Sequence, residues 1–164
     1  MRVVSNTSPV CNLAIIGRLG LLRRKFGKVV IPEAVARELS ALDHAKGRAN
    51  IEEALQDGWL TVECVCDRRL LPVLRSHIDE GEAEAIELAR QTHAELLILD
   101  DLDARRIAAE ESLPYTGLLG LLAEERMAGN LASLEDEIRR LRSECRFFVS
   151  PALELKLLCG VGER

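Results

Sequence analysis

Short apolar runs alternate along the chain with longer stretches in which apolar and polar residues are mixed. Runs rich in Val, Ile and Leu are typical of buried strands, and apolar residues spaced three or four positions apart are typical of helices. The runs predict strands at residues 3–4, 28–31, 60–66, 95–99 and near residue 115. The mixed stretches predict helices from residue 9, over 19–26, from 32, over 50–58, 68–76, 82–92, 103–112 and 118–128, and from 133. This alternation predicts an α/β fold with a parallel sheet, right-handed crossovers and helices on both faces.

Residues that favour helix ends mark several of these boundaries. Ser8 is expected to cap a helix whose first residue is Pro9, a position at which proline's missing N–H does no harm. Gly27 suits the end of the second helix, Pro32 opens the third, and Asn50 is expected to cap the fourth.

Length and composition fit one compact domain. A chain of 164 residues is long enough to bury a core, and its 48% hydrophobic and 30% charged content argues against disorder. We expect a single domain over 1–164, with the informative motifs in 1–130 and a helical extension over 131–164. The apolar runs are too short to span a bilayer and no apolar leader opens the sequence, so a cytoplasmic protein is expected. The net charge of −5 gives no general attraction for phosphate backbones, so contact with nucleic acid has to be local.

The cysteines and histidines do not have the spacing of a metal site. The five cysteines are scattered, odd in number and mostly within apolar stretches, which predicts buried free thiols. Cys64 and Cys66 are separated by one residue and have no second Cys or His pair nearby, which argues against zinc. We interpret the three histidines as structural or surface residues.

Polar side chains gather where two of the expected strands end. The first strand is followed by Asn6, Thr7 and Ser8. The strand over 95–99 is followed by Asp100, Asp101 and Asp103. In open α/β sheets, ligands bind beyond the carboxyl ends of the strands. Helix capping, at about 0.3–1 kcal/mol, would explain one of the three aspartates but not all three. A group of carboxylates repels itself unless a cation lies within it, which is how Mg²⁺ is held in proteins.

Two glutamates are further candidates for the same edge of the sheet. Glu38 lies two turns into its helix, at the boundary of the apolar stripe, and Glu82 is at the start of another helix. A solvated helix residue is the alternative interpretation for each, because a single glutamate carries little information. Glu84 and Glu87 share a helix with Glu82 but are expected to face away from it as surface charges.

Four segments carry these residues in a characteristic order. They are residues 3–9 (VVSNTSP), 30–39 (VIPEAVAREL), 79–86 (DEGEAEAI) and 97–108 (LILDDLDARRIA). Together they resemble the PIN domain family, in particular a branch whose first motif reads Ser-Asn-Thr-Ser-Pro. Each motif is weak alone, but four in order, at the expected strand ends and helix starts, are fairly specific.

The resemblance implies a three-layer α/β/α fold with a central parallel sheet of four to five strands. It implies a metal-dependent endoribonuclease that hydrolyses single-stranded RNA with Mg²⁺ or Mn²⁺ and leaves 5′-phosphate and 3′-hydroxyl ends. Carried over by motif, the catalytic residues are Glu38, Glu82, Asp101 and Asp103, the metal ligands are Asn6, Glu82, Asp101 and Asp103, and Ser8 and Asp100 are supporting residues. Many members are toxins of toxin–antitoxin pairs, which implies a small antitoxin as partner. The family habit also implies a homodimer, with residues 19–26 or 153–158 as candidate surfaces.

Asn6 departs from the family's usual acidic residue, since an amide oxygen can still bind a metal but brings no negative charge. A non-catalytic relative that binds RNA or a partner is therefore an open alternative. A phosphoryl-transfer fold with an aspartate nucleophile is a second one, although the first strand ends without Asp-x-Asp. Arg105 and Arg106 follow Asp103 and are the nearest candidates for RNA contact, with a solvated helix face as the alternative.

Overall fold

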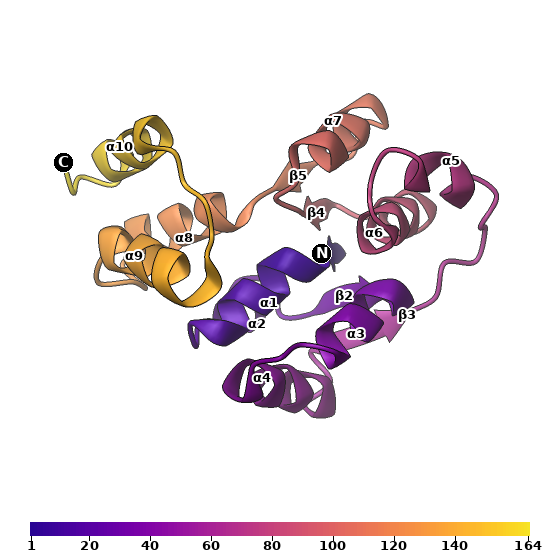
Figure 1. Ribbon diagram of the computed structural model, residues 1–164, viewed down its shortest axis with the longest axis horizontal. Coiled ribbons are helices and arrows are strands. Elements are labelled where there is room, and N and C mark those ends of the chain that lie inside the picture. Colours follow the sequence, from indigo (N-terminus) through magenta and orange to yellow (C-terminus); the bar gives the residue numbers. More distant parts are fainter. The chain divides into compact units, whose positions relative to one another are not determined.

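Five parallel strands form one sheet in the N-terminal part of the chain. The computed structural model describes residues 1–164. The strands are β1 (Val3–Ser5), β2 (Val29–Pro32), β3 (Leu60–Glu63), β4 (Leu96–Ile98) and β5 (Tyr115–Thr116). Their order in the sheet is β3-β2-β1-β4-β5, and every neighbouring pair is parallel (Figure 1). The carboxyl ends of all five strands therefore lie at one edge of the sheet.

Ten helices connect and follow the strands. Those before residue 117 are α1 (Thr7–Ile15), α2 (Gly20–Phe26), α3 (Glu33–Ser40), α4 (Ala45–Gln56), α5 (Leu71–Arg75), α6 (Glu80–Gln91) and α7 (Leu102–Glu110). Those after it are α8 (Leu118–Met127), α9 (Leu134–Cys145) and α10 (Pro151–Gly160). None of these helices has the length and apolar character needed to cross a membrane.

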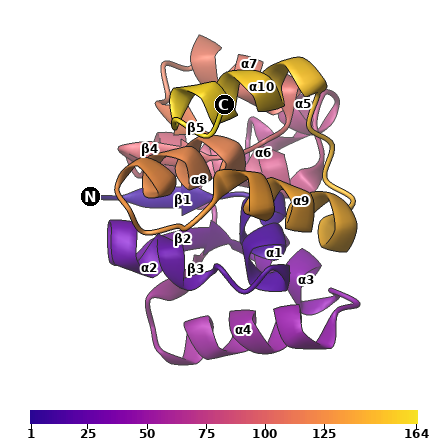
Figure 2. The ribbon, with the colours of Figure 1, turned by 90° about the vertical axis from the view of Figure 1, so that its left-hand side faces the viewer.

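Helices cover both faces of the sheet. On one face α6 packs against β1, β2 and β4, with α3, α5 and α7 beside it; on the other, α2 packs on β2, α4 on β3 and α1 on α4 (Figures 1 and 2). Because side chains alternate along a strand, Val4 and Leu97 join the core under α6, while Val3 and Ile98 point to the opposite face. All four side chains are buried. The predicted three-layer α/β/α fold with a parallel sheet of four to five strands is confirmed.

The chain divides into two compact units, Met1–Thr116 and Gly117–Arg164. The first contains the sheet and α1 to α7, and the second contains α8 to α10. Within the second unit, the Glu163 carboxylate accepts hydrogen bonds from the backbone N–H groups of Leu134 and Glu135 and from Arg126. Burial acts to raise the pKa of Glu163, but these hydrogen bonds outweigh it and lower the pKa. A single domain with an extension over 131–164 stays a prediction.

Several element boundaries differ from the predicted ones because other residues cap the helices. Asn6, not Ser8, occupies the N-cap position of α1, so Ser8 lies inside that helix. His44 caps α4 through its side chain, so the predicted cap Asn50 lies in the middle of a longer helix. Gly27 ends α2 as predicted, in the left-handed backbone region that glycine adopts without strain. The predicted strand over 60–66 and helix over 68–76 are both shorter in the structure.

The prediction of buried free cysteines is half right. All five are free, but Cys64, Cys66 and Cys159 are exposed, and Cys11 and Cys145 are partly buried. The pair after β3 is exposed because β3 is the edge strand and ends at Glu63, so irregular chain carries both thiols past the sheet.

Leu97 provides a test of the core. It lies in β4 between β1 and β5 and is fully buried. We expect Leu97→Ala to lower the free energy of unfolding by about 3 kcal/mol, because it removes buried methyl groups and leaves a cavity. Leu102→Ala is the control, since Leu102 is 79% exposed, and it should change stability by less than about 0.5 kcal/mol. Urea denaturation measures both, and equal losses would contradict this core.

Candidate active site

Asn6 lies at the carboxyl end of β1, directly beside β4. Its backbone N–H donates a 3.0 Å hydrogen bond to the carbonyl of Ile98, which continues the parallel pairing beyond β1. The side chain is 4% exposed and does not cap α1, and its Oδ1 atom has no hydrogen-bond partner. Leaving a buried polar atom unsatisfied costs about 1–3 kcal/mol. The sheet edge therefore holds a buried acceptor that a ligand would satisfy.

The three aspartates after β4 lie in three different environments. Asp101 Oδ1 accepts the 2.9 Å backbone hydrogen bond that caps α7. Asp100 is mostly buried, with the Arg105 guanidinium 3.5 Å away. Asp103 is well exposed and pairs with Arg106 at 3.6 Å. Capping thus accounts for one oxygen of one aspartate, as the sequence pattern indicated.

Glu82 occupies the first turn of α6, where it forms a capping box with Asp79. The Glu82 backbone N–H donates to Asp79 Oδ1 over 2.8 Å, and the Asp79 backbone N–H donates to Glu82 Oε2 over 3.1 Å. Glu82 is 9% exposed. Burial, followed by the charges of Asp79, Asp101 and Glu38, raises the pKa of Glu82 to about 7, despite the hydrogen bond from the Asp79 N–H. Glu82 is therefore the residue at which three of the four predicted motifs interact.

Glu38 approaches the start of α6 from α3. Its Oε2 atom accepts a hydrogen bond from the Thr7 hydroxyl. Its carboxylate also lies against Gly81, where an added Cβ would be only 2.8 Å from Glu38 Oε1. The missing side chain at position 81 therefore leaves the space that Glu38 occupies next to Glu82.

An open pocket of about 420 Å³ lies at this edge. Its lining consists of Arg75, Ser76, His77, Ile78, Asp79, Glu82, Asp101 and Asp103. Three of the predicted carboxylates, Glu82, Asp101 and Asp103, are thus brought to one cavity. Asn6 and Glu38 lie outside its lining, although Glu38 acts on the charge of Glu82.

The supporting and RNA-binding candidates are mostly engaged elsewhere. Ser8 Oγ accepts a 3.2 Å hydrogen bond from the Asn12 amide within α1. Arg105 Nε donates a 2.9 Å hydrogen bond to the Leu99 carbonyl, which secures the end of β4. Arg106 keeps an exposed side chain beside the pocket-lining Asp103. Of these candidates, Arg106 is the one with a charge available to a ligand in the pocket.

The sequence pattern did not single out two residues of the pocket, Arg75 and His77. They lie at the end of α5 and in the turn before α6. Arg75 Nη2 donates a 2.9 Å hydrogen bond to Glu80 Oε1, which holds the arginine at the start of α6. The sequence does contain a signal for this geometry, because Asp79 and Glu82 have capping-box spacing and fix where the turn meets the helix.

The prediction that Glu84 and Glu87 are surface charges is wrong, since each is 1% exposed. The sheet, α3, α5 and α7 all pack against α6, so most of its circumference is covered. Each buried carboxylate is paired with an arginine: Arg68 is 3.2 Å from Glu84, and Arg90 is 3.1 Å from Glu87.

The donor set fits a divalent cation in its chemistry, although it is not gathered into a finished cluster. No group of three or more His, Cys, Asp or Glu side chains is arranged to hold a metal ion. Amide and carboxylate oxygens are nevertheless the ligands that Mg²⁺ and Mn²⁺ prefer. A cation would satisfy the unpartnered oxygen of Asn6 and would offset the burial and the neighbouring negative charges that together raise the pKa of Glu82.

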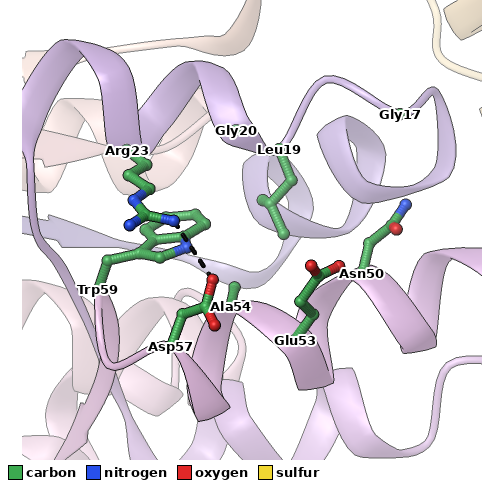
Figure 3. Close-up of a pocket in the computed structure, with 9 residues that line it drawn as sticks. All are labelled: Gly17, Leu19, Gly20, Arg23, Asn50, Glu53, Ala54, Asp57 and Trp59. Atoms are coloured by element: carbon green, nitrogen blue, oxygen red, sulfur yellow. Dashed lines mark hydrogen bonds and ion pairs between the residues drawn. The ribbon is translucent and has the colours of Figure 1, made fainter.

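A second hollow, of about 200 Å³, lies at the opposite, amino-terminal edge of the sheet (Figure 3). Trp59, which precedes β3, lines one side, and Arg23 pairs with Asp57 over 3.2 Å beside it. None of the predicted site residues belongs to its lining. The predicted metal ligands and catalytic residues therefore all lie away from this hollow, although Glu53 and Asp57 give it acidic side chains of its own.

Comparison with known families agrees with this geometry. A family model described as a PIN domain matches residues 2–163. The match includes residues beyond 130, which the four motifs do not reach, and no curated protein matches the chain. The family resemblance carried by the motifs is confirmed, and the toxin branch stays a prediction.

The pH dependence of stability tests the environment of Glu82. Because its pKa rises from an ordinary 4.5 to about 7 in the folded protein, its contribution to stability is complete below about pH 4.5 and is lost as the pH rises toward 7. We expect Glu82→Gln to gain about 1–2 kcal/mol over the wild type between pH 5 and pH 8, measured in EDTA by urea denaturation. Glu80→Gln, in the same turn, is the control. A difference that does not change with pH would contradict the assignment.

Proposed function

The chain belongs to the PIN domain family, whose members are generally nucleases, and on that premise we propose that it is a metal-dependent endoribonuclease. Its substrate in this proposal is single-stranded RNA, and its ion is Mg²⁺ or Mn²⁺. We also propose that it is the toxin of a toxin–antitoxin pair.

The crowding of carboxylates around Glu82 carries the proposal. Asp79, Asp101 and Glu38 all act to raise the pKa of Glu82, which is itself buried at the carboxyl edge of a parallel sheet. Helix capping accounts for one oxygen of Glu82 and one of Asp101, but it does not require that the two residues share a pocket. A metal-binding role accounts for the shared pocket.

Asn6, Glu82, Asp101 and Asp103 are the residues that would hold the ion. When bound, Mg²⁺ or Mn²⁺ would polarise the phosphate and lower the pKa of water. Glu38 has a separate task, because the Thr7 hydroxyl fixes one of its oxygens beside the ligand set. Its carboxylate would accept a proton from the water that attacks phosphorus. The 3′-oxygen would leave with a proton taken from solvent water at the open pocket, which gives a 5′-phosphate and a 3′-hydroxyl end.

Basic or polar side chains close to the pocket would bind the RNA backbone. The chain carries a net charge of −5 and few aromatic residues, so neither a general positive field nor base stacking accounts for binding. Arg75 and His77 line the pocket, and Arg106 lies beside Asp103. These side chains would contact phosphates on either side of the scissile bond.

A non-catalytic RNA-binding or partner-binding protein is the second candidate function, and Asn6 favours it. An amide at this position brings one negative charge fewer than an aspartate, which weakens binding of a divalent ion. The phosphoryl-transfer alternative loses its support, because the family match covers nearly the whole chain.

Partner contacts are part of the proposal. Of the two surfaces predicted for a homodimer, the one on α2 is weakened because Leu22 is fully buried. On α10, Leu153 and Leu155 are 42% and 50% exposed, which supports this helix as the surface for a second copy. A short reading frame directly upstream of the gene would support a small antitoxin as the other partner.

Cleavage assays test the enzymatic proposal. We expect the wild type to cut single-stranded RNA with Mn²⁺, and Glu82→Gln and Asp101→Asn each to lose about 100-fold or more in kcat/KM, because each removes a charge that holds the ion. Glu95→Gln is a matched control, since Glu95 is exposed at the far edge of the sheet. If all four proteins cut equally, the activity is a contaminant and the enzymatic proposal fails.

Asn6→Asp tests the metal ligand directly. We expect it to bind Mn²⁺ about tenfold more tightly in titration calorimetry, a gain of about 1.4 kcal/mol, because the added charge faces the ion. In EDTA the variant should be less stable than the wild type, because a buried carboxylate without a cation is costly. Asn12→Asp adds the same charge further along α1 and should leave Mn²⁺ binding unchanged; it serves as a control for binding alone, because it also removes the hydrogen bond to Ser8. Unchanged or weaker Mn²⁺ binding by Asn6→Asp would count against Asn6 as a ligand.

A further inference from the structure

Glu84 joins three separate parts of the first unit through one buried carboxylate. Its side chain belongs to α6 and is 1% exposed. Glu84 Oε2 accepts a 2.8 Å hydrogen bond from the backbone N–H of Ala34, in the first turn of α3. Glu84 Oε1 accepts a 3.2 Å hydrogen bond from the Arg68 guanidinium, in the segment between β3 and α5.

The N-terminus of α3 needs this carboxylate because it has no cap of its own. The first N–H groups of any helix lack partners within the helix, and the N-cap residue of α3 is Pro32, which makes no side-chain cap hydrogen bond. Glu84 supplies the acceptor from another helix, and the positive end of the α3 dipole stabilises its charge. Arg68 supplies the countercharge that a buried carboxylate requires.

This contact also fixes the distance between two residues of the candidate site. α3 carries Glu38, and α6 carries Glu82 and Gly81, against which the Glu38 carboxylate lies. Two side-chain hydrogen bonds join these helices: an exposed one of 3.3 Å from Arg37 of α3 to Glu80 of α6, and the buried one from the Ala34 N–H to Glu84, which is the one that holds the backbone of α3. A shift of α3 along α6 would therefore move Glu38 relative to Glu82.

We propose that Glu84 is a positioning residue, which caps α3 from α6 and thereby holds Glu38 beside Glu82. The catalytic consequence rests on the function proposed above, whereas the capping role does not. Glu84 does not line the pocket, and it is not a partner in the hydrogen bond between Thr7 and Glu38. Its effect on the reaction is therefore exerted through α3.

Glu87 offers a matched control on the same helix. It is also 1% exposed and also binds an arginine, but its partners Arg90 and Gln91 both belong to α6. Replacement of either glutamate by glutamine keeps the volume and removes one buried charge. Only replacement of Glu84 breaks a contact with α3.

In Glu84→Gln, the amide oxygen can accept a hydrogen bond from the Ala34 N–H or from the Arg68 guanidinium. The NH₂ group then faces the other of these two donors and cannot bind it. We expect the amides of residues 34–36 to exchange with solvent about tenfold faster or more, measured by NMR hydrogen exchange. We expect kcat for RNA to fall about 100-fold, with KM and Mn²⁺ affinity within about twofold of the wild type, because misplacement of Glu38 affects chemistry rather than binding. Glu87→Gln should leave all four quantities unchanged.

The outcomes separate this proposal from the function on which it partly rests. Unchanged exchange at residues 34–36 in Glu84→Gln overturns the proposal, and so do equal losses of kcat in Glu84→Gln and Glu87→Gln. If the wild type does not cut RNA, the proposed function fails and hydrogen exchange alone decides the capping role. If Glu84→Gln does not fold, Glu84→Asp decides, because it keeps the charge but is one methylene shorter, which withdraws the acceptor from the Ala34 N–H. It should speed exchange at residues 34–36, and no change there overturns the proposal.

Discussion

The parallel pairing of β1 with β4 is the contact on which the candidate site depends. Ser5 lies opposite Ile98, and the next N–H, that of Asn6, still donates to the Ile98 carbonyl. Both strands therefore end at the same level, so the polar residues after β1 and the aspartates after β4 emerge at one edge. A slip of one residue would exchange the side chains that face the two helix layers, mismatch their packing and move the acids after β4 away from the polar residues after β1. The same register that builds the core therefore builds the site.

Electrostatic balance distinguishes the site from the rest of the molecule. Elsewhere, buried carboxylates have nearby donors: Glu84 and Glu87 face arginines, and Glu163 caps α9 with help from Arg126. Glu82 instead accepts one backbone hydrogen bond and lies among three other carboxylates. The fold tolerates this repulsion because the pocket is open to water and because Glu82 holds a proton near neutral pH. A divalent cation would displace that proton and turn the repulsion into attraction.

The sequence predicted the sheet and the acidic edge well, because both follow from local patterns. Apolar runs that end abruptly in polar residues reveal a buried strand and the place where its carboxyl end lies, as before Asp100. What the sequence did not reveal depends on contacts between distant elements. Helical spacing placed Glu84 and Glu87 away from Glu82, but α6 is covered on several sides, so facing away from Glu82 does not mean facing water. Likewise, a cap provided by Glu84 to a helix fifty positions away has no signature in the first turn of that helix.

Asn6 bears on whether the protein is an enzyme or a non-catalytic relative through the burial of its side chain as well as through its lack of charge. Its Oδ1 atom is buried and unpartnered, and it does not even serve as the cap that an asparagine at this position usually provides. An apolar side chain of similar size would avoid a cost of about 1–3 kcal/mol, so the fold alone gives no reason for an amide here. A cation coordinated by this oxygen would give a reason for the amide. The residue that brings no charge to the proposed metal site therefore supports, by its burial, the proposal that a cation binds there.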